Sequence, residues 1–366
     1  MNKTMRAISA LILLIFLMVS CAPKPVIVEE TAPDSFAGNL FEYEPEVTDF
    51  DKSKELDWKR LGQYGDVDIY KVRGLGVLLG EPSLFTKDEQ KTIEGKIAQY
   101  KKIIQANKDI NFHAFYLELI ENSPYHPVNA EFKHADAGRS YDFFSANKPK
   151  RLKLDALRLT SFEDHLKYYY RTDHHWNAYG ILQGYEQIYQ LLADSYPDIS
   201  PMITSGEVYT FPDIAFLGRW AKLLNHNVKS DPFSVYLANL PPYRIYDRDG
   251  NEIDYNNKDE YLAGHYSTEK FADHYVEYYG EDVDFLEYVS DNGSDRNLLI
   301  IGDSFTNAIE PLLASHYQHT YCVDIRKYPD YKWSFSEFVS QYDVDDVLIL
   351  GGAGVVMYQW RWSIQP

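Results

Sequence analysis

Residues 297–307, N-L-L-I-I-G-D-S-F-T-N, decide the fold of this chain. The four consecutive apolar residues 298–301 do not alternate with polar ones. Such a run is typical of a strand covered by helices on both faces of a parallel sheet. The run stops at Gly302, which puts Ser304 at the carboxyl end of the strand, where open α/β sheets bind ligands. Ser304 is therefore a candidate nucleophile.

A turn followed by a helix cap is the alternative interpretation of Gly-Asp-Ser, because these residue types are common at both places. Thr306 also stands where a G-x-S-x-G sequence needs glycine. The stretch therefore lacks the nucleophile elbow of α/β-hydrolases. If Ser304 reacts, another part of the chain must supply its base.

Helix and strand patterns alternate on both sides of this stretch. Thr86 and Glu89 form a capping box before the first long helical pattern, and Pro311 fits the first turn of a helix that begins near Glu310. The predicted elements are a helix over Lys87–Ala106, a strand over 110–117, a helix over 178–192, a strand over 298–301, the helix from Glu310, a strand over 320–325, a helix capped by Ser334 and Glu337, and a strand over 347–350. The strands with intervening helices predict a right-handed parallel sheet.

Two long segments break this regular pattern. Residues 122–150 are polar and contain three prolines and one glycine, so we expect mostly loops there. Residues 202–293 are irregular and aromatic, with a hairpin signal at Asp249-Gly250. We predict that they form an insertion of about 202–293 with its own β structure.

The N-terminus resembles a bacterial lipoprotein signal. Lys3 and Arg6 precede an apolar run over residues 7–19, and Cys21 follows directly after the small residue Ser20. We expect residues 1–20 to be the signal peptide and Cys21 to be lipidated, with an ordinary signal peptide or a short anchor helix as alternatives. Residues 21–55 contain four prolines among many acids, which predicts a flexible acidic tether before a folded domain over 56–366.

The amino-acid composition limits the classes of partner that we expect for this protein. The 366 residues include 55 Asp and Glu against 36 Lys and Arg, a formal charge of −19 that repels phosphate backbones, so we expect no nucleic-acid partner. The 31 tyrosines suit a core and also stacking on sugar rings. With Cys21 lipidated, Cys322 has no disulfide partner and is predicted to be an inert core thiol. No cofactor is expected.

The second informative stretch is residues 172–177, T-D-H-H-W-N. In an extended segment the side chains of Asp173 and His175 lie on one side, while His174 points away. The carboxylate can then orient the imidazole, which is one half of a Ser-His-Asp triad. Two alternatives are a helix cap at Asp173 with satisfied histidines, and a zinc site. We expect no metal, because the sequence has no second ligand cluster such as H-E-x-x-H.

Together, R-T-D-H-H-W-N at 171–177 and L-L-I-I-G-D-S-F at 298–305 resemble the DHHW family of bacterial envelope proteins and the alginate O-acetyltransferase group. Both groups belong to or resemble the SGNH hydrolases. The resemblance implies an α/β fold with a three-layer α/β/α SGNH-hydrolase-like parallel sheet and an irregular β-rich insertion. It also implies Ser304 as nucleophile, His175 as base and Asp173 as the residue that orients His175.

One feature departs from that resemblance. SGNH enzymes generally use a later glycine and an asparagine as oxyanion-hole donors, but this chain has G-G-A-G-V-V after its last strand and no asparagine there. The candidate donors are the backbone N–H groups of Ser304 and of Gly351 or Gly352, assisted by Arg171 or Asn177. Loss of one donor typically lowers turnover by about 10²–10³.

The leading hypothesis is a membrane-tethered serine esterase or O-acyltransferase. The resemblance favours O-acetyl transfer to an extracellular or cell-envelope polysaccharide, and it implies a membrane protein as acyl donor. Lipid on Cys21 would hold the protein on the extracytoplasmic side of the cell membrane. The alternative is a non-catalytic polysaccharide-binding or assembly lipoprotein on a decayed SGNH fold, which the missing asparagine and the tyrosine-rich insertion favour.

Overall fold

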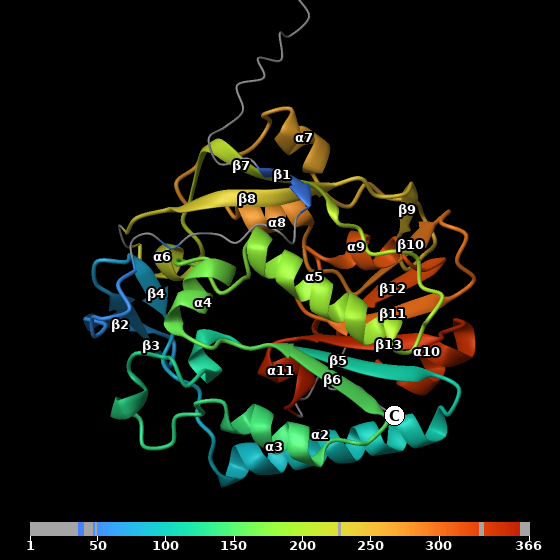
Figure 1. The fold of residues 1–366 in the computed structure, drawn as a ribbon, viewed down its shortest axis with the longest axis horizontal. Coiled ribbons are helices and arrows are strands. Elements are labelled where there is room, and N and C mark those ends of the chain that lie inside the picture. Colours follow the sequence, from blue (N-terminus) through green and yellow to red (C-terminus); the bar gives the residue numbers. More distant parts are fainter. Residues whose placement is uncertain (1–35, 40–46, 48–49, 226–227, 329–332, 359–366) are drawn as a thin grey trace, which may run out of the picture. The chain divides into compact units, whose positions relative to one another are not determined.

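The centre of the protein is a seven-stranded sheet in the order β6-β5-β13-β11-β12-β10-β9 (Figure 1). The computed structural model describes residues 36–39, 47, 50–225, 228–328 and 333–358. The strands are β5 (Asn111–Leu117), β6 (Leu152–Leu157), β9 (Tyr243–Tyr246), β10 (Phe285–Ser290), β11 (Asn297–Gly302), β12 (His319–Val323) and β13 (Asp346–Gly351). The first five in spatial order are parallel. Strand β10 is antiparallel to β12, and β9 is antiparallel to β10.

Strand β11 lies between β13 and β12, and all six of its residues are buried. Leu299 is paired with Val347 of β13 and with Tyr321 of β12. Both neighbours follow β11 in the chain, and β13 alone joins β11 to β5 in the order of the sheet. The apolar run that lacks alternation is therefore a central strand, as predicted.

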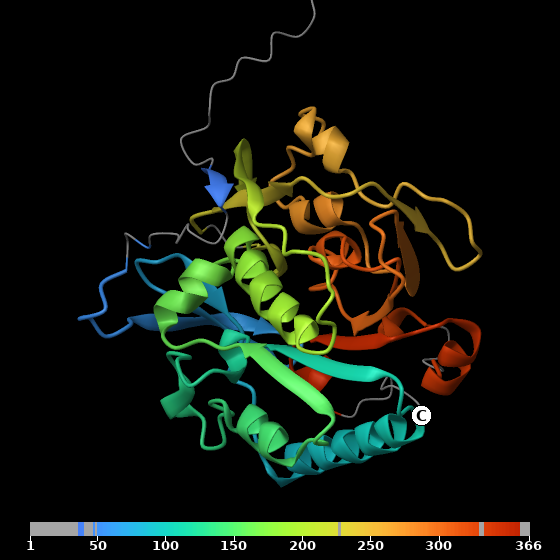
Figure 2. The same ribbon diagram turned by 45° about the vertical axis from the view of Figure 1, so that its right-hand side comes forward.

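Helices cover both faces of this sheet. On one face lie α4 (Phe162–Tyr168), α5 (Ala178–Ala193), α8 (His274–Tyr279) and α9 (Glu310–Ala314), and on the other α2 (Lys87–Ala106), α3 (Arg139–Asn147), α10 (Phe335–Gln341) and α11 (Ala353–Val356). Leu298 and Ile300 pack into the first core, and Leu299 and Ile301 into the second. Figure 2 shows α5, in lime green, and α2, in cyan, on opposite sides of the sheet. The predicted three-layer α/β/α fold is confirmed.

Two predicted helix starts are confirmed in detail. At α2, the N–H of Thr86 donates to Oε2 of Glu89 at 3.1 Å, and the N–H of Asp88 donates to Oγ1 of Thr86 at 3.2 Å. Helix α9 begins at Glu310 with Pro311 in its first turn. The first N–H groups of a helix have no acceptor within the helix. At α2 the side chain of Thr86 supplies one, and at α9 Pro311 has no N–H group that would need one.

Helix α3 and strand β6 are among the elements that were not predicted. Helix α3 lies within the segment expected to be mostly loops, and it begins after Gly138, whose backbone is left-handed with φ 84°. Strand β6 follows it, with a mixed burial pattern at the edge of the sheet. A short helix after a glycine and a partly exposed edge strand carry weak hydrophobic patterns.

The structure divides the predicted β-rich insertion into two parts. Strands β7 (Ser205–Phe216) and β8 (Asp231–Ala238) form a separate antiparallel sheet with β1 (Phe36–Asn39), whereas β9 and β10 extend the central sheet. The turn after β9 contains Gly250 at φ 80°, which agrees with the hairpin signal. The remaining elements are a sheet of β2 (Trp58–Tyr64), β3 (Val67–Val72) and β4 (Val77–Leu79), and the short helices α6 (Arg219–Leu223) and α7 (Lys258–Leu262).

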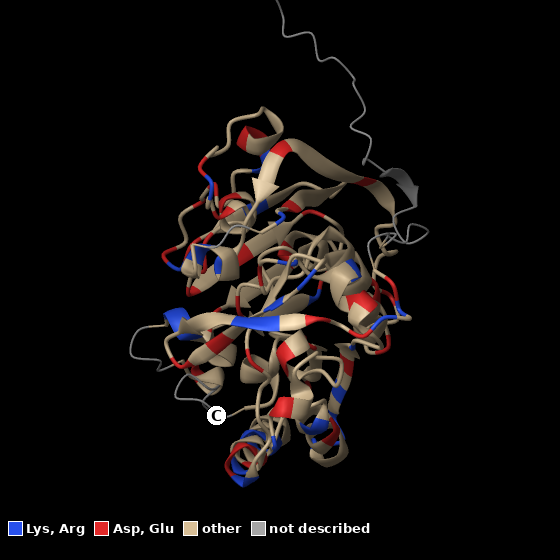
Figure 3. Cartoon of the chain, turned by 90° about the vertical axis from the view of Figure 1, so that its left-hand side faces the viewer, with Lys and Arg blue, Asp and Glu red and all other residues tan. Residues whose placement is uncertain are grey.

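Most of the N-terminal predictions concern residues that the structure does not describe. The signal segment and Cys21 lie outside the described residues. Strand β1 lies within the predicted tether, so the paired part of the chain begins earlier than residue 56. Among the described residues, none of the helices combines the length and apolarity needed to cross a bilayer. Acidic and basic residues are interspersed along the described chain (Figure 3).

Candidate active site

Ser304 lies two residues beyond β11, at the carboxyl edge of the central sheet. The preceding Gly302 allows the tight turn, because a Cβ there would collide with the side chain of Thr306 and lie 2.9 Å from the carbonyl oxygen of Leu350. The backbone N–H of Ser304 donates no hydrogen bond within the part of the chain that the structure describes. Both the side chain and the N–H group are thus available at the sheet edge.

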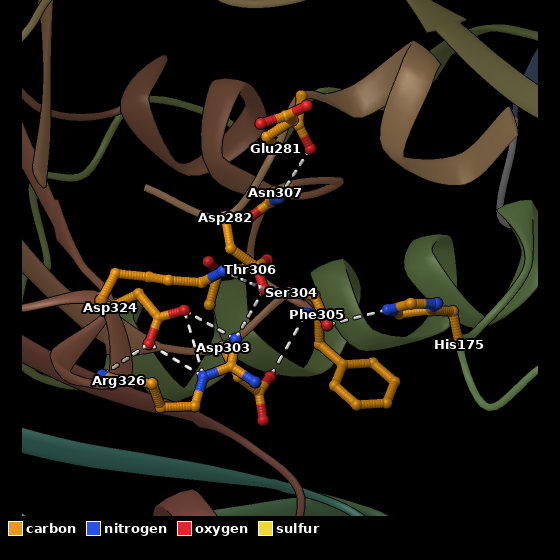
Figure 4. Close-up of polar contacts among 12 residues, drawn as sticks. His175, Glu281, Asp282, Asp303, Ser304, Phe305, Thr306, Asn307, Asp324 and Arg326 are labelled. Atoms are coloured by element: carbon orange, nitrogen blue, oxygen red, sulfur yellow. Dashed lines mark hydrogen bonds and ion pairs between the residues drawn. The ribbon is translucent and has the colours of Figure 1, made fainter. Parts of the chain in front are cut away.

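His175 links Ser304 to Asp173. Its Nε2 lies 2.8 Å from Oγ of Ser304 (Figure 4), and its Nδ1 lies 2.6 Å from Oδ1 of Asp173. His175 and Asp173 are each 6% exposed. A buried carboxylate on one imidazole nitrogen leaves the other nitrogen to accept the serine proton, which is the arrangement of a general base beside a nucleophile.

The segment that carries Asp173 and His175 is a tight bend, which corrects the predicted extended segment. Tyr169 and Trp176 form an antiparallel bridge at its base. Within the bend, Oδ1 of Asp173 accepts the backbone N–H of His175 at 3.0 Å as well as its ring nitrogen. The two residues meet because the aspartate folds back over the turn, as short polar side chains do.

Asp231, at the start of β8, holds the beginning of this bend. Its carboxylate accepts the backbone N–H groups of Arg171 and Thr172, both at 3.0 Å, and the hydroxyl of Thr172 at 2.7 Å. Burial raises the pKa of Asp231 to about 6, although these hydrogen bonds act in the opposite direction. The sequence reasoning missed this residue, since nothing local in D-P-F-S marks it as a partner of a segment 59 residues earlier.

The second oxygen of Asp173 is held by helix α6. The backbone N–H of Arg219 donates to Oδ2 at 2.6 Å, and a Cβ at Gly218 would collide with the side chain of Asp173. Burial alone would raise the pKa of Asp173. The adjacent His174 and His175, with the hydrogen bonds from His175 and Arg219, outweigh burial and lower that pKa well below its ordinary value. Asp173 is therefore ionised across the physiological range.

His174 does not point away from its neighbours, which corrects a second expectation. Its ring centroid lies 4.0 Å from that of His175, and its Nδ1 lies 3.4 Å from Oδ1 of Asp173. Burial, followed by the nearby His175, lowers the pKa of His174 to about 3. A neutral His174 thus packs beside the imidazole of His175, because the bend brings both rings to one side.

Tyr275 on α8 forms the other side of the His175 site. Its ring stacks on the imidazole of His175, and its hydroxyl donates to the carbonyl oxygen of Ser304 at 3.3 Å. The same hydroxyl accepts the indole N–H of Trp176 at 3.2 Å. No sequence signal separates Tyr275 from the other tyrosines, so it was not predicted.

Two predicted oxyanion-hole donors have other partners. The side chain of Asn177 accepts the N–H groups of Tyr179 and Gly180 as the N-cap of α5, and its amide donates to the carbonyl oxygen of Lys167. Nη1 of Arg171 donates to the carbonyl oxygen of Leu75 at 2.9 Å. Both residues therefore support the bend and the helix start, and the structure gives no reason to place them at an oxyanion.

The predicted glycines lie at the correct edge of the sheet. Gly351 ends β13, next to β11, and a Cβ there would lie 3.0 Å from Oδ2 of Asp303. Gly352 is the N-cap of α11. Gly351 and Gly352 therefore remain candidate oxyanion-hole donors, together with the N–H of Ser304, which donates no hydrogen bond among the described residues.

A charged cluster of Asp282, Asp303, Asp324 and Arg326 lies beside Ser304 (Figure 4). Arg326 donates from Nε to Asp324 at 2.9 Å and from Nη2 to Asp282 at 3.1 Å. Burial raises the pKa of Asp303 to about 6, and Arg326 partly opposes this shift. Asp303 also accepts the N–H of Phe305 at 3.2 Å, which fixes the turn around Ser304.

The cavity over Ser304 is small and mixed in character. It has a volume of about 350 Å³, and Ser304, His175, Phe271, Val276, Arg219 and Arg326 are among the residues that line it. This volume is near the lower end of the range for small-molecule sites, roughly 300–1,000 Å³. The space suits an acyl group with part of its leaving group.

A metal-binding arrangement can also be tested on the geometry. Ligand atoms of Asp173, His174 and His175 lie within 4.8 Å of one another. However, Nδ1 and Nε2 of His175 are already engaged by Asp173 and Ser304. These hydrogen bonds favour a chain of proton-transfer groups over a metal centre.

The comparisons with known proteins give the class of fold. No family model matches the sequence, and no curated protein matches it significantly. Two solved structures of Bacillus cereus PatB1 match, one of them with a sulfonyl adduct. The structure with the adduct has a TM-score of 0.65 and 17% identity over 83% of this chain and all of that chain. The other has a TM-score of 0.64 and 19% identity over 79% of this chain and 97% of that chain.

A DHHW family protein from Eubacterium siraeum is also similar, with a TM-score of 0.60 and 16% identity over 83% of this chain and 97% of that chain. At these identities the likeness shows the fold alone. The chain is therefore an α/β protein with the three-layer fold of these structures. The fold that the DHHW resemblance implied is the fold that the chain has.

Proposed function

We propose that this protein is a serine O-acyltransferase that moves an acetyl group from an ester donor to a hydroxyl of an extracellular or cell-envelope polysaccharide. The observation that carries this proposal is the hydrogen-bond chain from Ser304 through His175 to Asp173 at the edge of the sheet. With water as the acceptor, the same groups would act as an esterase.

The reaction has two balanced steps. Oγ of Ser304 attacks the ester carbonyl while its proton passes to Nε2 of His175, and the alcohol of the donor leaves with that proton. The acceptor hydroxyl then attacks the acyl-serine, gives its proton to His175 and releases Ser304 with its proton restored. Asp173 holds the imidazole in the required tautomer in both steps.

The charge that develops on the carbonyl oxygen needs N–H donors. The unengaged N–H of Ser304 is the first candidate donor, and Gly351 or Gly352 at the adjacent strand end is the second. Each donor of this kind contributes about 10²–10³ to turnover. A backbone-only pair would account for a working site without the asparagine.

The proposed location, on the outer side of the cell membrane, rests on the sequence of residues 1–21. Cleavage before Cys21 and its lipidation would hold the domain on the outer side of the cell membrane, near a membrane-borne acyl donor and the polysaccharide. We expect Cys21→Ala to leave uncleaved precursor or unlipidated protein, measured by metabolic labelling with a palmitate analogue and mass spectrometry. A mature wild-type protein that starts at another residue would contradict this location.

The function is tested with a serine-directed sulfonyl fluoride, and a similar PatB1 structure was solved with a sulfonyl adduct. Intact-mass and peptide analysis should place one adduct on Ser304, with none on Ser304→Ala and at least tenfold slower labelling of His175→Ala. Ser53→Ala, which changes an exposed serine, serves as the control. A wild-type protein that is neither labelled nor active on an acetyl ester would support the non-catalytic polysaccharide-binding alternative.

A further inference from the structure

A second and larger cavity lies beside the one over Ser304. Its volume is about 750 Å³, and its lining includes Glu81, Leu84, Glu89, Glu121, Arg219 and Trp220. These residues come from the loop after β4, the first turns of α2, the loop after β5 and helix α6. The volume lies well within the range of ligand sites, roughly 300–1,000 Å³.

The two cavities share part of their walls. His174 and Arg219 line both of them. His174 packs on the ring of His175, and the N–H of Arg219 holds Asp173. A molecule in the larger cavity would thus contact His174 and Arg219, the two residues that pack on His175 and hold Asp173.

The walls of the larger cavity combine flat apolar faces with hydrogen-bond acceptors. Trp220 is half-buried there, and Leu84 and Val67 are 43% and 37% exposed. Between them, Oε1 of Glu121 accepts the N–H of Gly80 at 3.1 Å. Aromatic faces beside fixed polar groups suit a pyranose ring, which has apolar C–H faces and a rim of hydroxyls.

The charge of this cavity is negative. Three acidic side chains, those of Glu81, Glu89 and Glu121, line it against the single guanidinium of Arg219, among the described residues, and burial raises the pKa of Glu121 above its ordinary value. The carboxylate of Glu89 is fixed by the N–H of Thr86 at 3.1 Å, so it cannot turn far from the cavity. Fixed carboxylates in a partly desolvated cavity repel an anionic ligand and attract a cationic one.

We infer that the larger cavity is the acceptor site, and that it takes a saccharide bearing hydroxyls or amino groups and no carboxylate or phosphate. This inference rests on the proposed function, because it assigns the acceptor of that reaction. The small cavity then holds the acyl group on Ser304, and the acceptor hydroxyl enters past His174.

The test compares acceptors of similar size that differ in charge. 4-Nitrophenyl acetate serves as the donor, nitrophenolate release measures the first step, and mass spectrometry measures the acetylated sugar. The acceptors are oligomers of N-acetylglucosamine, oligomers of glucosamine and oligomers of a uronic acid. We expect kcat/KM for transfer to the two acceptors without a negative charge to exceed that for the uronic acid at least tenfold.

Two kinds of variant locate the acceptor. Trp220→Ala should lower the ratio of transfer to hydrolysis at least fivefold, whereas Trp58→Ala, a partly buried tryptophan on β2 that does not line this cavity, should leave the ratio unchanged. The double variant Glu81→Gln, Glu121→Gln should reduce the discrimination against the uronic acid at least threefold. Circular dichroism confirms that each variant is folded.

The outcomes separate the two proposals. Equal or faster transfer to the uronic acid, or no transfer to any of the three acceptors while 4-nitrophenyl acetate is hydrolysed, would overturn the inference and leave the serine chemistry standing. An unchanged transfer ratio in folded Trp220→Ala would also overturn it. Failure of the sulfonyl reagent to label Ser304 would instead overturn the proposed function.

Discussion

The imidazole of His175 lies flat against the phenol ring of Tyr275, with ring centroids 4.0 Å apart and planes 9° from parallel. The hydroxyl of Tyr275 also contacts both the carbonyl oxygen of Ser304 and the indole of Trp176. One side chain therefore sets the orientation of the imidazole and the position of the serine backbone at once.

This contact predicts a graded loss in two Tyr275 variants. Tyr275→Phe keeps the stacking and loses both hydrogen bonds, so kcat for acetyl-ester hydrolysis should fall roughly three- to tenfold. Tyr275→Leu loses the stacking as well as the hydrogen bonds, so its kcat should fall by up to about 10²-fold, since small misplacements of catalytic groups have effects of that size. KM should change little in either variant. Tyr64→Leu, at a 47% exposed position, is the control, and a fully active Tyr275→Leu enzyme would contradict the positioning role.

The chain from Ser304 to Asp173 should behave as one unit. Ser304→Ala and His175→Ala should each abolish most ester hydrolysis. The double variant should be little less active than either single variant, because the effects of substituting groups that act together are not additive. Asp173→Asn should lower kcat by up to about 10⁴, through the wrong imidazole tautomer. Activity that is lost on dialysis against a chelator and restored by zinc would instead indicate a metal centre at Asp173, His174 and His175.

The position of His174 predicts a different phenotype from that of His175. His174→Ala removes a ring that packs on His175 and lines both cavities. We expect a several-fold loss in kcat/KM for transfer to a saccharide and a smaller loss in ester hydrolysis, measured side by side. If His174→Ala inactivates the protein more than His175→Ala does, the assignment of His175 as the base is wrong.

Because Gly218 lies against Asp173, we expect a larger residue at position 218 to inactivate the protein by a steric clash. A Cβ at Gly218 would overlap the side chain of Asp173, so Gly218→Ala should displace the carboxylate and destabilise the protein by about 1–3 kcal/mol, as overpacking typically does. Gly62→Ala is the matched control, because its Cβ would meet its nearest neighbour, Cδ2 of Leu224, at 3.9 Å. Urea unfolding and ester hydrolysis measure both effects. Equal behaviour of the two variants would contradict the close approach.

Asp303 predicts a pH-dependent difference in stability. Its pKa is raised by burial from 3.8 to about 6, so the folded protein binds a proton more tightly than the unfolded chain. Asp303 therefore contributes stability that is full below about pH 4 and is lost as the pH rises through about 6. Relative to Asp303→Asn, the wild type should lose on the order of 2–3 kcal/mol between pH 4 and pH 7.5. Urea unfolding at several pH values measures the difference, and a constant difference would contradict the raised pKa.

The sequence was most informative where local patterns decide the structure. The capping box of Thr86 and Glu89 and the uninterrupted apolar run of β11 each depend on residues close in the chain, and both were predicted. The pairing of Asp173 with His175 was also expected, but from an extended backbone. The bend that actually joins them depends on Asp231, a partner too far along the chain to be read from a local pattern.

The features that were not predicted are those set by tertiary contacts. Tyr275 acts through stacking on a ring 100 positions earlier, and its own neighbours Tyr278 and Tyr279 look alike in the sequence. Strands β9 and β10 read as part of an irregular insertion. The edge strand β9 has only four residues and is mostly partly exposed, and β10 alternates buried and partly exposed residues over part of its length, so neither has the continuous apolar run of the central strands. Asn177 looked like a polar group at the site, but a helix start uses it as a cap.

The position of β13 has a consequence for how the chain matures. Strands β5 and β6 come from the first half of the sequence, and β11 with its other neighbours from the second, yet β13 is the strand that connects the two sets. Among the described strands, β13 is also the last in chain order. A chain that emerges from the ribosome or crosses a membrane in order cannot close this sheet until residues 346–351 arrive. A product truncated before residue 346 would lack the strand that joins β5 and β6 to β11.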